Sequence, residues 1–565
     1  MTEKRSLQAT RLAEKRTWRG VALYVVAAML AAWQYTGPAA NEKPPEEPSG
    51  RRAVSNLGLL LGEGEPSHPA GSIENENFRT RLLDQLNELA LEAKVIPLSE
   101  QFGGKTQMAN ILIRSPGKKA ARPIVLATHY DSCLWGPGAG DAGQCVAAVM
   151  ETLQSLSHAP LEHEFWVLLT DHEERGPNEG GLQGAADFLK RRDFPWGDTV
   201  PLIINFDARG NRGAALLYET HRNNYGAMRV AAANIASPRV TTSLMVNVYD
   251  HLPNKTDFTL FREAGWCGWN FAVIGGTEHY HQPSDSLINL SPRSVEHFSM
   301  HAERMLRALN KMEDASLQQI DASQPAVFFD LIGTFVIIYP AWGNWLQAGV
   351  VLFLLIAACM RSRASPLRAR MIVCTIGMIV LCVITSAACG WLISTIFART
   401  GWVPRRFVRG GDMICLIYPA IAMVLNMELG RRLPRQITRK ETTIALAFTA
   451  LAAGAATAWA LPGGAYLFLW PATFLALWSN YEIAVINNSR SRFVVLNAAV
   501  WNAVVPAVLC APTYVLLAQA LGPLSGLVLA GVVSAMLLPT LLAWPEVDVA
   551  PMNVPVQMTT ASQGG

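Results

Sequence analysis

Histidine and carboxylate residues follow the ends of several apolar segments in this chain. The run Ile124–Ala127 leads into His129 and Asp131, and a loop rich in glycine and proline then carries Asp141. Ligands of α/β proteins bind beyond the carboxyl ends of the strands, so polar side chains at such ends are candidate site residues. A metal site is the first chemistry that these residue types suggest.

Three further segments end in the same way. Glu173 and Glu174 follow the apolar run Phe165–Thr170, Asp207 ends the run L-I-I-N-F-D, and His281 lies in T-E-H-Y-H-Q-P-S-D-S. Adjacent carboxylates can divide the work, because one can bind a metal while the other acts as a general base toward water. A mixture of imidazole nitrogen and carboxylate oxygen suits zinc. Together these segments predict a two-metal zinc site.

Each residue also has an ordinary structural interpretation. A histidine two residues from an aspartate is common, although Asp131 is placed to hold the second ring nitrogen of His129. Asp141 could be a turn residue or a helix N-cap, and the glutamate pair could be a solvated acidic turn. The rival ligands are Asp171, His172 and His279, with Asp285 as a candidate supporting group.

Residues 75–312 have the composition and the alternation of a soluble α/β domain. Helix-like segments intervene between strand-like runs, which predicts a mostly parallel sheet covered on both faces. The strand-like runs are Asn110–Ile113, Pro123–Thr128, Glu164–Thr170, Leu202–Phe206 and Ala214–Leu217. The helix-like segments include Phe78–Ala93, Gln144–Leu156 and Leu182–Arg191.

The overall composition is that of a membrane protein. Of the 565 residues, 50% are hydrophobic and only 16% are charged, which is too apolar for a soluble enzyme of this length. The net charge of +3 gives no indication of a nucleic-acid partner, and the nine cysteines follow no disulfide or zinc-binding spacing.

Apolar segments long enough to cross a bilayer lie in the second half of the chain, near 342–360, 371–397, 412–429, 441–460, 465–479, 496–520 and 523–544. The predicted organisation is a basic tail and transmembrane anchor (1–37), a linker (38–74), the α/β domain (75–312), a linker or interfacial segment (313–341), a domain of about seven membrane helices (342–545) and a polar tail (546–565). A cleaved signal peptide is the alternative for the first segment.

Basic residues predict the orientation in the membrane. The loops 361–370, 431–440 and 489–492 are basic and fall on the cytoplasmic side, which places the domain of residues 75–312 on the non-cytoplasmic side. The loop 399–409 is an exception, since it holds four arginines and falls outside. A bacterial inner membrane with the domain in the periplasm is favoured, or an endomembrane lumen in a eukaryote.

The order His129-x-Asp131, Asp141, Glu173-Glu174, Asp207, His281 resembles the co-catalytic dizinc aminopeptidases, of the aminopeptidase Y and aminopeptidase S type. The motifs G-P-G-A-G-D-A-G, N-F-D-A-R-G, T-D-F-T-L-F-R-E-A-G and Y-H-Q-P-S-D look most like the membrane-embedded branch, which includes the vacuolar membrane proteases and the endoplasmic reticulum metallopeptidase. The resemblance covers about residues 75–312, and the rest of the chain only by its multi-span character.

The resemblance implies a three-layer α/β/α sandwich with a mixed sheet and two zinc ions per chain. One zinc would be held by His129 and Asp207, the other by Glu174 and His281, with Asp141 bridging them. Glu173 would be the general base and Asp131 the residue that orients His129. The chain departs from the family in having Asp171-His172 before the glutamate pair, where Gly or Ala is usual, and Asp207 where eukaryotic membrane members often carry Glu.

Peptides and the lipid bilayer are the partners that this interpretation implies, with removal of N-terminal residues as the reaction. One alternative is an acyltransferase similar to glutaminyl cyclase, which would use a single zinc. Another is a receptor or transport-associated ectodomain without catalysis, although every ligand position is filled and few ionisable groups lie inside the spans.

Overall fold

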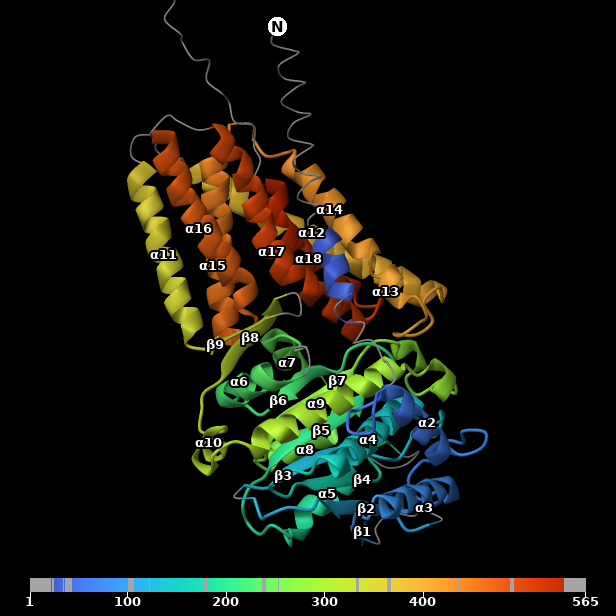
Figure 1. Cartoon of the computed structure of the whole chain (residues 1–565). Helices are drawn as coiled ribbons and strands as arrows, with labels where there is room; N and C mark the ends of the chain where they lie inside the picture. Colours follow the sequence, from blue (N-terminus) through green and yellow to red (C-terminus); the bar gives the residue numbers. More distant parts are fainter. Residues whose placement is uncertain are drawn as a thin grey trace, which may run out of the picture.

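A computed structural model describes residues 22, 25–33, 35, 43–99, 106–120, 122–175, 180–235, 240–252, 254–331, 335–362, 367–434, 436–487 and 492–542. An α/β domain lies at one end of a bundle of long apolar helices (Figure 1). The bundle is formed by the second half of the chain, as the composition predicts.

The α/β domain is built on a seven-stranded sheet in the order β1-β2-β4-β3-β5-β7-β6. The four neighbours β4, β3, β5 and β7 are parallel, while β1, β2 and β6 pair antiparallel at the two edges. This confirms the predicted mixed sheet. The strands are β1 (Ala93–Pro97), β2 (Ala109–Arg114), β3 (Ile124–His129), β4 (Trp166–Thr170), β5 (Leu202–Ala208), β6 (Leu216–Thr220) and β7 (Cys267–Val273).

Helices cover both faces of this sheet, because its central strands are apolar on both sides. In β3, Ile124 and Leu126 pack with helices α2, α4 and α9, whereas Val125 and Ala127 pack with α5 and α8. Successive residues of a strand point to opposite faces, so each face has its own core. The three-layer α/β/α fold is thereby confirmed. The helices are α2 (Gly50–Leu61), α3 (Ile73–Glu88), α4 (Gln144–His158), α5 (Gln183–Arg191), α6 (Tyr225–Asn234), α7 (Ser243–Tyr249), α8 (Asp257–Glu263) and α9 (Pro292–Asn310).

Helix α2 lies within residues 38–74, for which a linker is predicted, and the linker interpretation does not hold for this helix. Ser49 caps it by accepting a hydrogen bond from the Arg52 N–H, and Ala53, Leu57 and Leu60 are buried in the core of the α/β domain. The polar residues around this short apolar stripe conceal its helical period. The α/β domain therefore begins before residue 75.

Residues 313–341 form helix α10 (Asp314–Gln319) and a hairpin of β8 (Ala326–Leu331) and β9 (Phe335–Pro340), instead of a simple interfacial segment. Phe328 packs into the core of the α/β domain, while its neighbours Val327 and Phe329 pack into the core shared with the helical bundle. Because neighbouring side chains of the hairpin pack into different cores, the hairpin joins the two domains.

The bundle contains the predicted apolar helices. Within the described residues, four helices are long and apolar enough to cross a membrane, namely Gly343–Arg361, Ala369–Thr400, Gly411–Gly430 and Lys440–Ala460. Two shorter apolar helices follow, Val505–Leu521 and Gly526–Leu538. The elements are α11 (Gly343–Arg361), α12 (Ala369–Thr400), α13 (Gly411–Ile414), α14 (Ile417–Gly430), α15 (Arg439–Ala460), α16 (Tyr466–Asn487), α17 (Arg492–Leu521) and α18 (Gly526–Leu542). In the predicted anchor, residues 25–33 are helical, whereas the basic tail 1–21 and the polar tail 546–565 lie outside the described residues.

The basic loop that the charge pattern leaves unexplained contacts the α/β domain. Arg405 donates a hydrogen bond to the Glu278 carbonyl at 3.3 Å, and Arg406 donates to the Leu521 carbonyl at 3.1 Å. Both guanidinium groups thus bond backbone carbonyls, and both contacts lie at the end of the bundle that faces the α/β domain. Arg405 therefore contacts the α/β domain, whereas Arg406 contacts the end of α17 within the helical bundle.

The position of α2 in the core can be tested on one helix. Leu57 is fully buried and Leu59 is 65% exposed, so Leu57→Ala should lower the free energy of unfolding by about 2–5 kcal/mol and Leu59→Ala by less than about 0.5 kcal/mol. Urea unfolding of the full chain in detergent, followed by tryptophan fluorescence, measures both. Equal effects of the two substitutions would mean that α2 lies outside the core.

Candidate metal centre

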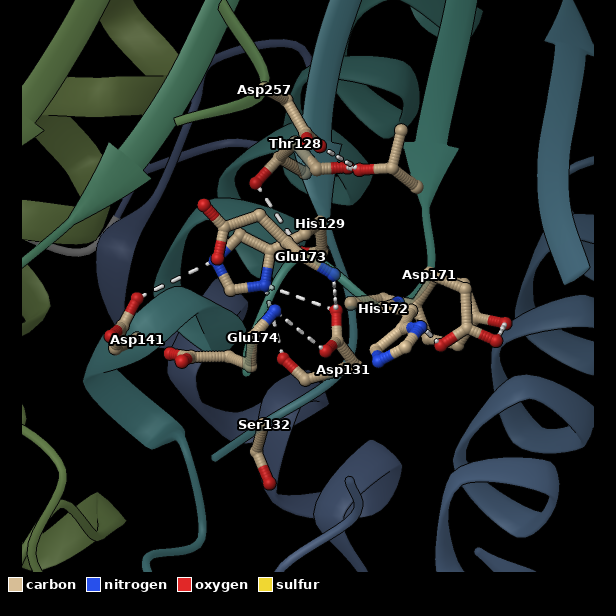
Figure 2. Close-up of polar contacts among 12 residues, drawn as sticks. Thr128, His129, Asp131, Ser132, Asp141, Asp171, His172, Glu173, Glu174 and Asp257 are labelled. Carbon is tan, nitrogen blue, oxygen red and sulfur yellow. Dashed lines mark hydrogen bonds and ion pairs between the residues drawn. The ribbon is translucent and has the colours of Figure 1, made fainter. Parts of the chain in front are cut away.

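Three neighbouring parallel strands deliver candidate ligands to one edge of the sheet. His129 is the last residue of β3 and pairs in register with Thr170 at the end of β4, while Asp207 lies near the end of β5 on the other side of β3. Glu173 and Glu174 follow the end of β4 after two residues. The carboxyl ends of parallel strands meet at the same edge, so these side chains converge, as Figure 2 shows for His129, Glu173 and Glu174.

The loop that carries Asp141 is shaped by its glycines and by Asp285. A Cβ atom on Gly140 would lie 2.5 Å from a carboxylate oxygen of Asp285, so only glycine fits there. That carboxylate accepts hydrogen bonds from the N–H groups of Gly140 at 2.8 Å and Asp141 at 3.1 Å. The close approach fixes the backbone of the loop, and Asp285 is a supporting group of the site.

Asp141 lies between two groups of candidate ligands. Its Oδ1 is 3.5 Å from His129 Nε2, which is itself 3.9 Å from Asp207 Oδ1. Its Oδ2 is 3.3 Å from His281 Nε2, which is 2.8 Å from Glu174 Oε1. In each group the ligand atoms all lie within 4.8 Å of one another. The side chain of Asp141 therefore offers one oxygen to each group.

These residues fit a pair of zinc ions. The buried Nε2 of His129 has no hydrogen-bond partner in the part of the chain that the structure describes, and it faces carboxylate oxygens of Asp141 and Asp207. A buried nitrogen of this kind is expected to have a partner, and a metal ion supplies one. Nitrogen and oxygen donors from histidine and carboxylates are a usual set for zinc.

Asp131 supports both halves of the site. His129 Nδ1 lies 3.1 Å from the Asp131 carbonyl oxygen and 3.4 Å from its Oδ1, so this nitrogen carries the proton and leaves Nε2 free for a ligand role. The two carboxylate oxygens of Asp131 also accept hydrogen bonds from the N–H groups of Glu173, at 3.0 Å, and Glu174, at 3.1 Å. One side chain thus holds a histidine and the backbone of the glutamate pair.

The clustered carboxylates shift one another's pKa. Burial raises the pKa of Glu174 to about 8 and that of Asp207 to about 6, and the charge of Asp141 contributes to both increases. Burial opposes ionisation of Asp141 too, but its contacts with His129 and His281 lower its pKa below the usual range. Carboxylates that resist ionisation because of their neighbours form a natural site for cations.

Glu173 lies beside these groups. Burial raises its pKa well above the usual range, and the charges of Asp207 and Glu174 add to the shift while His129 opposes it. A carboxylate with a raised pKa accepts a proton readily near neutral pH. Glu173 lines the same cavity as Asp141 and His281, which leaves it within reach of a bound substrate.

The rival ligands are engaged elsewhere. Asp171 accepts hydrogen bonds from the Ala109 N–H and the Tyr130 hydroxyl, both at 3.0 Å, and Figure 2 shows it with His172 on the far side of His129 from Asp141. His279 Nδ1 lies 3.0 Å from the Ser284 hydroxyl. The seven residues that the sequence singles out as ligands, base and orienting group come together, and these three do not join them.

Two residues that the sequence analysis leaves without a role also belong to the site. Tyr280 stacks on the His281 ring with 3.8 Å between centroids and lines the cavity. Asp257 is buried at the start of α8 and accepts a hydrogen bond from the Thr170 hydroxyl at the end of β4. Two features of the sequence could have identified these residues. Tyr280 is next to the predicted ligand His281, and Asp257 lies in the motif T-D-F-T.

A cavity of about 800 Å³ opens above the ligands. Asp141, Glu173, Glu174, Asp207 and His281 contribute to its lining. Its other walls come from the segment 133–135 after β3, from α7 and the residues that follow it, and from the end of α17. A volume of this size lies within the range of about 300–1,000 Å³ that ligand-binding pockets have.

Comparison with known proteins agrees with this geometry. Residues 110–305 match the model of peptidase family M28. The chain is 25% identical over 303 residues to a vacuolar membrane protease of Eremothecium gossypii, a match that covers 48% of this chain and 28% of that protein. It is 24% identical over 241 residues to a Caenorhabditis elegans protein whose name describes an endoplasmic reticulum metallopeptidase, covering 41% of this chain and 26% of the relative. The matched part thus spans less than a third of the length of either relative.

Solved structures give weaker matches. A Zn-dependent exopeptidase from Parabacteroides distasonis is 12% identical with a TM-score of 0.36 and covers 48% of this chain and 100% of its own. A glutaminyl cyclase from Macrostomum lignano is 15% identical with a TM-score of 0.39 and covers 47% of this chain and 90% of its own.

The family match spans strands β2 to β7 and all seven residues that the sequence singles out. Residues 110–305 are therefore similar to peptidase family M28.

Proposed function

We propose that this protein is a membrane-embedded zinc metallopeptidase that removes N-terminal residues from peptides with two zinc ions. The observation that supports this most strongly is the position of Asp141, whose two oxygens face separate ligand groups while Glu173 lies beside them. Sharing of one carboxylate between two ligand groups is the arrangement of a two-metal hydrolytic site.

His129 and Asp207 would hold one zinc, Glu174 and His281 the other, and Asp141 would bridge them. Bound zinc supplies Lewis acidity, which polarises a peptide carbonyl and makes water a better nucleophile. Glu173 would accept a proton from the attacking water and deliver it to the nitrogen of the leaving amine. Asp131 keeps His129 in the tautomer that presents Nε2 and holds the backbone of Glu173 at the correct distance.

The preference for the amino end of a peptide follows from the resemblance to dizinc aminopeptidases. It can be tested with paired substrates, an amino-acyl amide and the same compound with its amino group acetylated. Hydrolysis of the free amine alone supports an aminopeptidase, whereas equal hydrolysis of both would favour an endopeptidase.

The side of the membrane is part of the proposal. The basic loops 361–370 and 431–440 favour the cytoplasm for one end of the bundle and the periplasm, or a lumen in a eukaryote, for the peptidase domain. The contact of Arg405 with the Glu278 carbonyl supports this orientation, because it gives an arginine of the basic loop on the other side a partner in the α/β domain.

Removing the proposed base should separate catalysis from metal binding. Glu173→Gln keeps the size of the side chain but cannot accept a proton, so kcat on an amino-acyl amide should fall at least about 10²–10⁴-fold. Zinc content, measured by plasma mass spectrometry of the same preparation, should stay at the wild-type level. Unchanged turnover would remove Glu173 from the mechanism.

Zinc stoichiometry tests the bridge. Wild-type protein should carry two zinc ions per chain, His281→Ala about one, and Asp141→Ala fewer than His281→Ala, because Asp141 serves both ligand groups. His279→Ala is a matched control, since it removes a neighbouring histidine that bonds Ser284. A single zinc in the wild-type protein, with cyclisation of an N-terminal glutamine, would favour the glutaminyl-cyclase alternative.

A further inference from the structure

The cavity above the ligands is bounded in part by the membrane domain. Asp141 and His281 line it on one side, and Gln519, Ala520 and Leu521 of α17 line it on another. We propose that the end of α17 is a specificity-determining wall of the substrate pocket, which admits a peptide end with a large apolar side chain. This inference rests on the peptidase function proposed above.

The end of α17 is held in a defined position. The Arg406 side chain donates hydrogen bonds to the carbonyls of Leu521, at 3.1 Å, and Ala520, at 3.4 Å, which satisfies the final carbonyls of the helix. Gly522 then turns the chain with φ +69°, and a Cβ atom there would lie 2.3 Å from the Arg406 carbonyl oxygen. Since only glycine permits this close packing, the wall has a fixed place relative to the loop that caps it.

Helix α7, which also lines the cavity, is docked on the same domain. The Ser243 hydroxyl donates to the Gly463 carbonyl at 2.7 Å, and Asn247 Oδ1 accepts from the Gly463 N–H at 2.9 Å. A Cβ atom on Gly463 would lie 2.4 Å from the Ser243 carbonyl oxygen, so the two backbones are in close contact. The membrane domain therefore provides one wall and fixes the base of another.

The side chains of these walls determine what fits between them. Met245 and Val248 of α7, Ile274 after β7, and Ala520 and Leu521 of α17 are apolar. An apolar side chain that leaves water for this space gains free energy in proportion to the surface it buries. A leucine side chain at the cleaved end is therefore expected to be preferred over alanine.

The test uses the full chain in detergent and compares kcat/KM for leucine and alanine amides. Ala520→Trp fills the space at the α17 wall, so the leucine-to-alanine ratio of kcat/KM should fall about tenfold or more. Leu527→Trp is the matched control, because Leu527 is 50% exposed on α18 and does not line the cavity. An unchanged ratio in Ala520→Trp, or an equal fall in Leu527→Trp, would overturn the proposal.

A second measurement does not depend on turnover. Ala520→Cys places a thiol on the wall, and its modification by a maleimide can be followed by mass spectrometry of the peptide that contains position 520. Leucine amide should slow this modification and glycine amide should not. Equal rates with both compounds contradict the wall even if the enzyme is active, whereas selective protection in a protein that hydrolyses no amino-acyl amide would retain the wall and reject the proposed peptidase function.

Discussion

The carboxylate of Asp131 accepts the amide N–H groups of Glu173 and Glu174, and this pair of hydrogen bonds ties the ends of β3 and β4 together. Because both acceptor oxygens are used, the backbone after β4 has one position relative to His129. Glu173, the proposed base, and Glu174, a proposed ligand, are thus held in place relative to His129, the proposed ligand at the end of the neighbouring strand. A buried carboxylate with satisfied hydrogen bonds gives such a link the strength of charge-assisted contacts.

The loop that carries Asp141 is also held in place by its neighbours. Its loop is thin because Gly140 lies against Asp285, and behind the loop Leu57 of α2 reaches Gly143, where an added Cβ atom would lie 3.2 Å from it. The position of Asp141 therefore depends on a helix that lies before the matched family region and on an aspartate in the loop after β7. A carboxylate that must face two ligand groups needs a backbone supported from both sides.

The central strands and the seven proposed site residues were predictable because each signal is local. An apolar run that ends in a histidine or a carboxylate marks a strand end without knowledge of what lies beside it. Helix α2 was not predictable in this way, because its apolar stripe of Leu57, Leu60 and Leu61 becomes recognisable as core only when α4 and α9 pack against it.

Strand β7 is likewise not predicted from the sequence, since the apolar run C-G-W-N-F-A-V contains a glycine and an asparagine that its neighbours accommodate. A Cβ atom on Gly268 would lie 1.8 Å from the Ile203 carbonyl oxygen of β5, and Asn270 bonds Glu219 of β6 at 3.0 Å. A local sequence pattern does not predict long-range contacts of this kind.

The junction between the domains shows why the membrane half is more than an attachment. In the hairpin, Phe328 packs into the core of the α/β domain, and Val327 and Phe329 pack into the core shared with the helical bundle. The two faces of one strand therefore pack into two different cores. Arg406 and Gly463 then fix α17 and α7 at the rim of the cavity. An anchor alone would need only a flexible connection, whereas these contacts are close, backbone-mediated and glycine-dependent. The helical bundle and the α/β domain consequently form one continuous structure around the cavity.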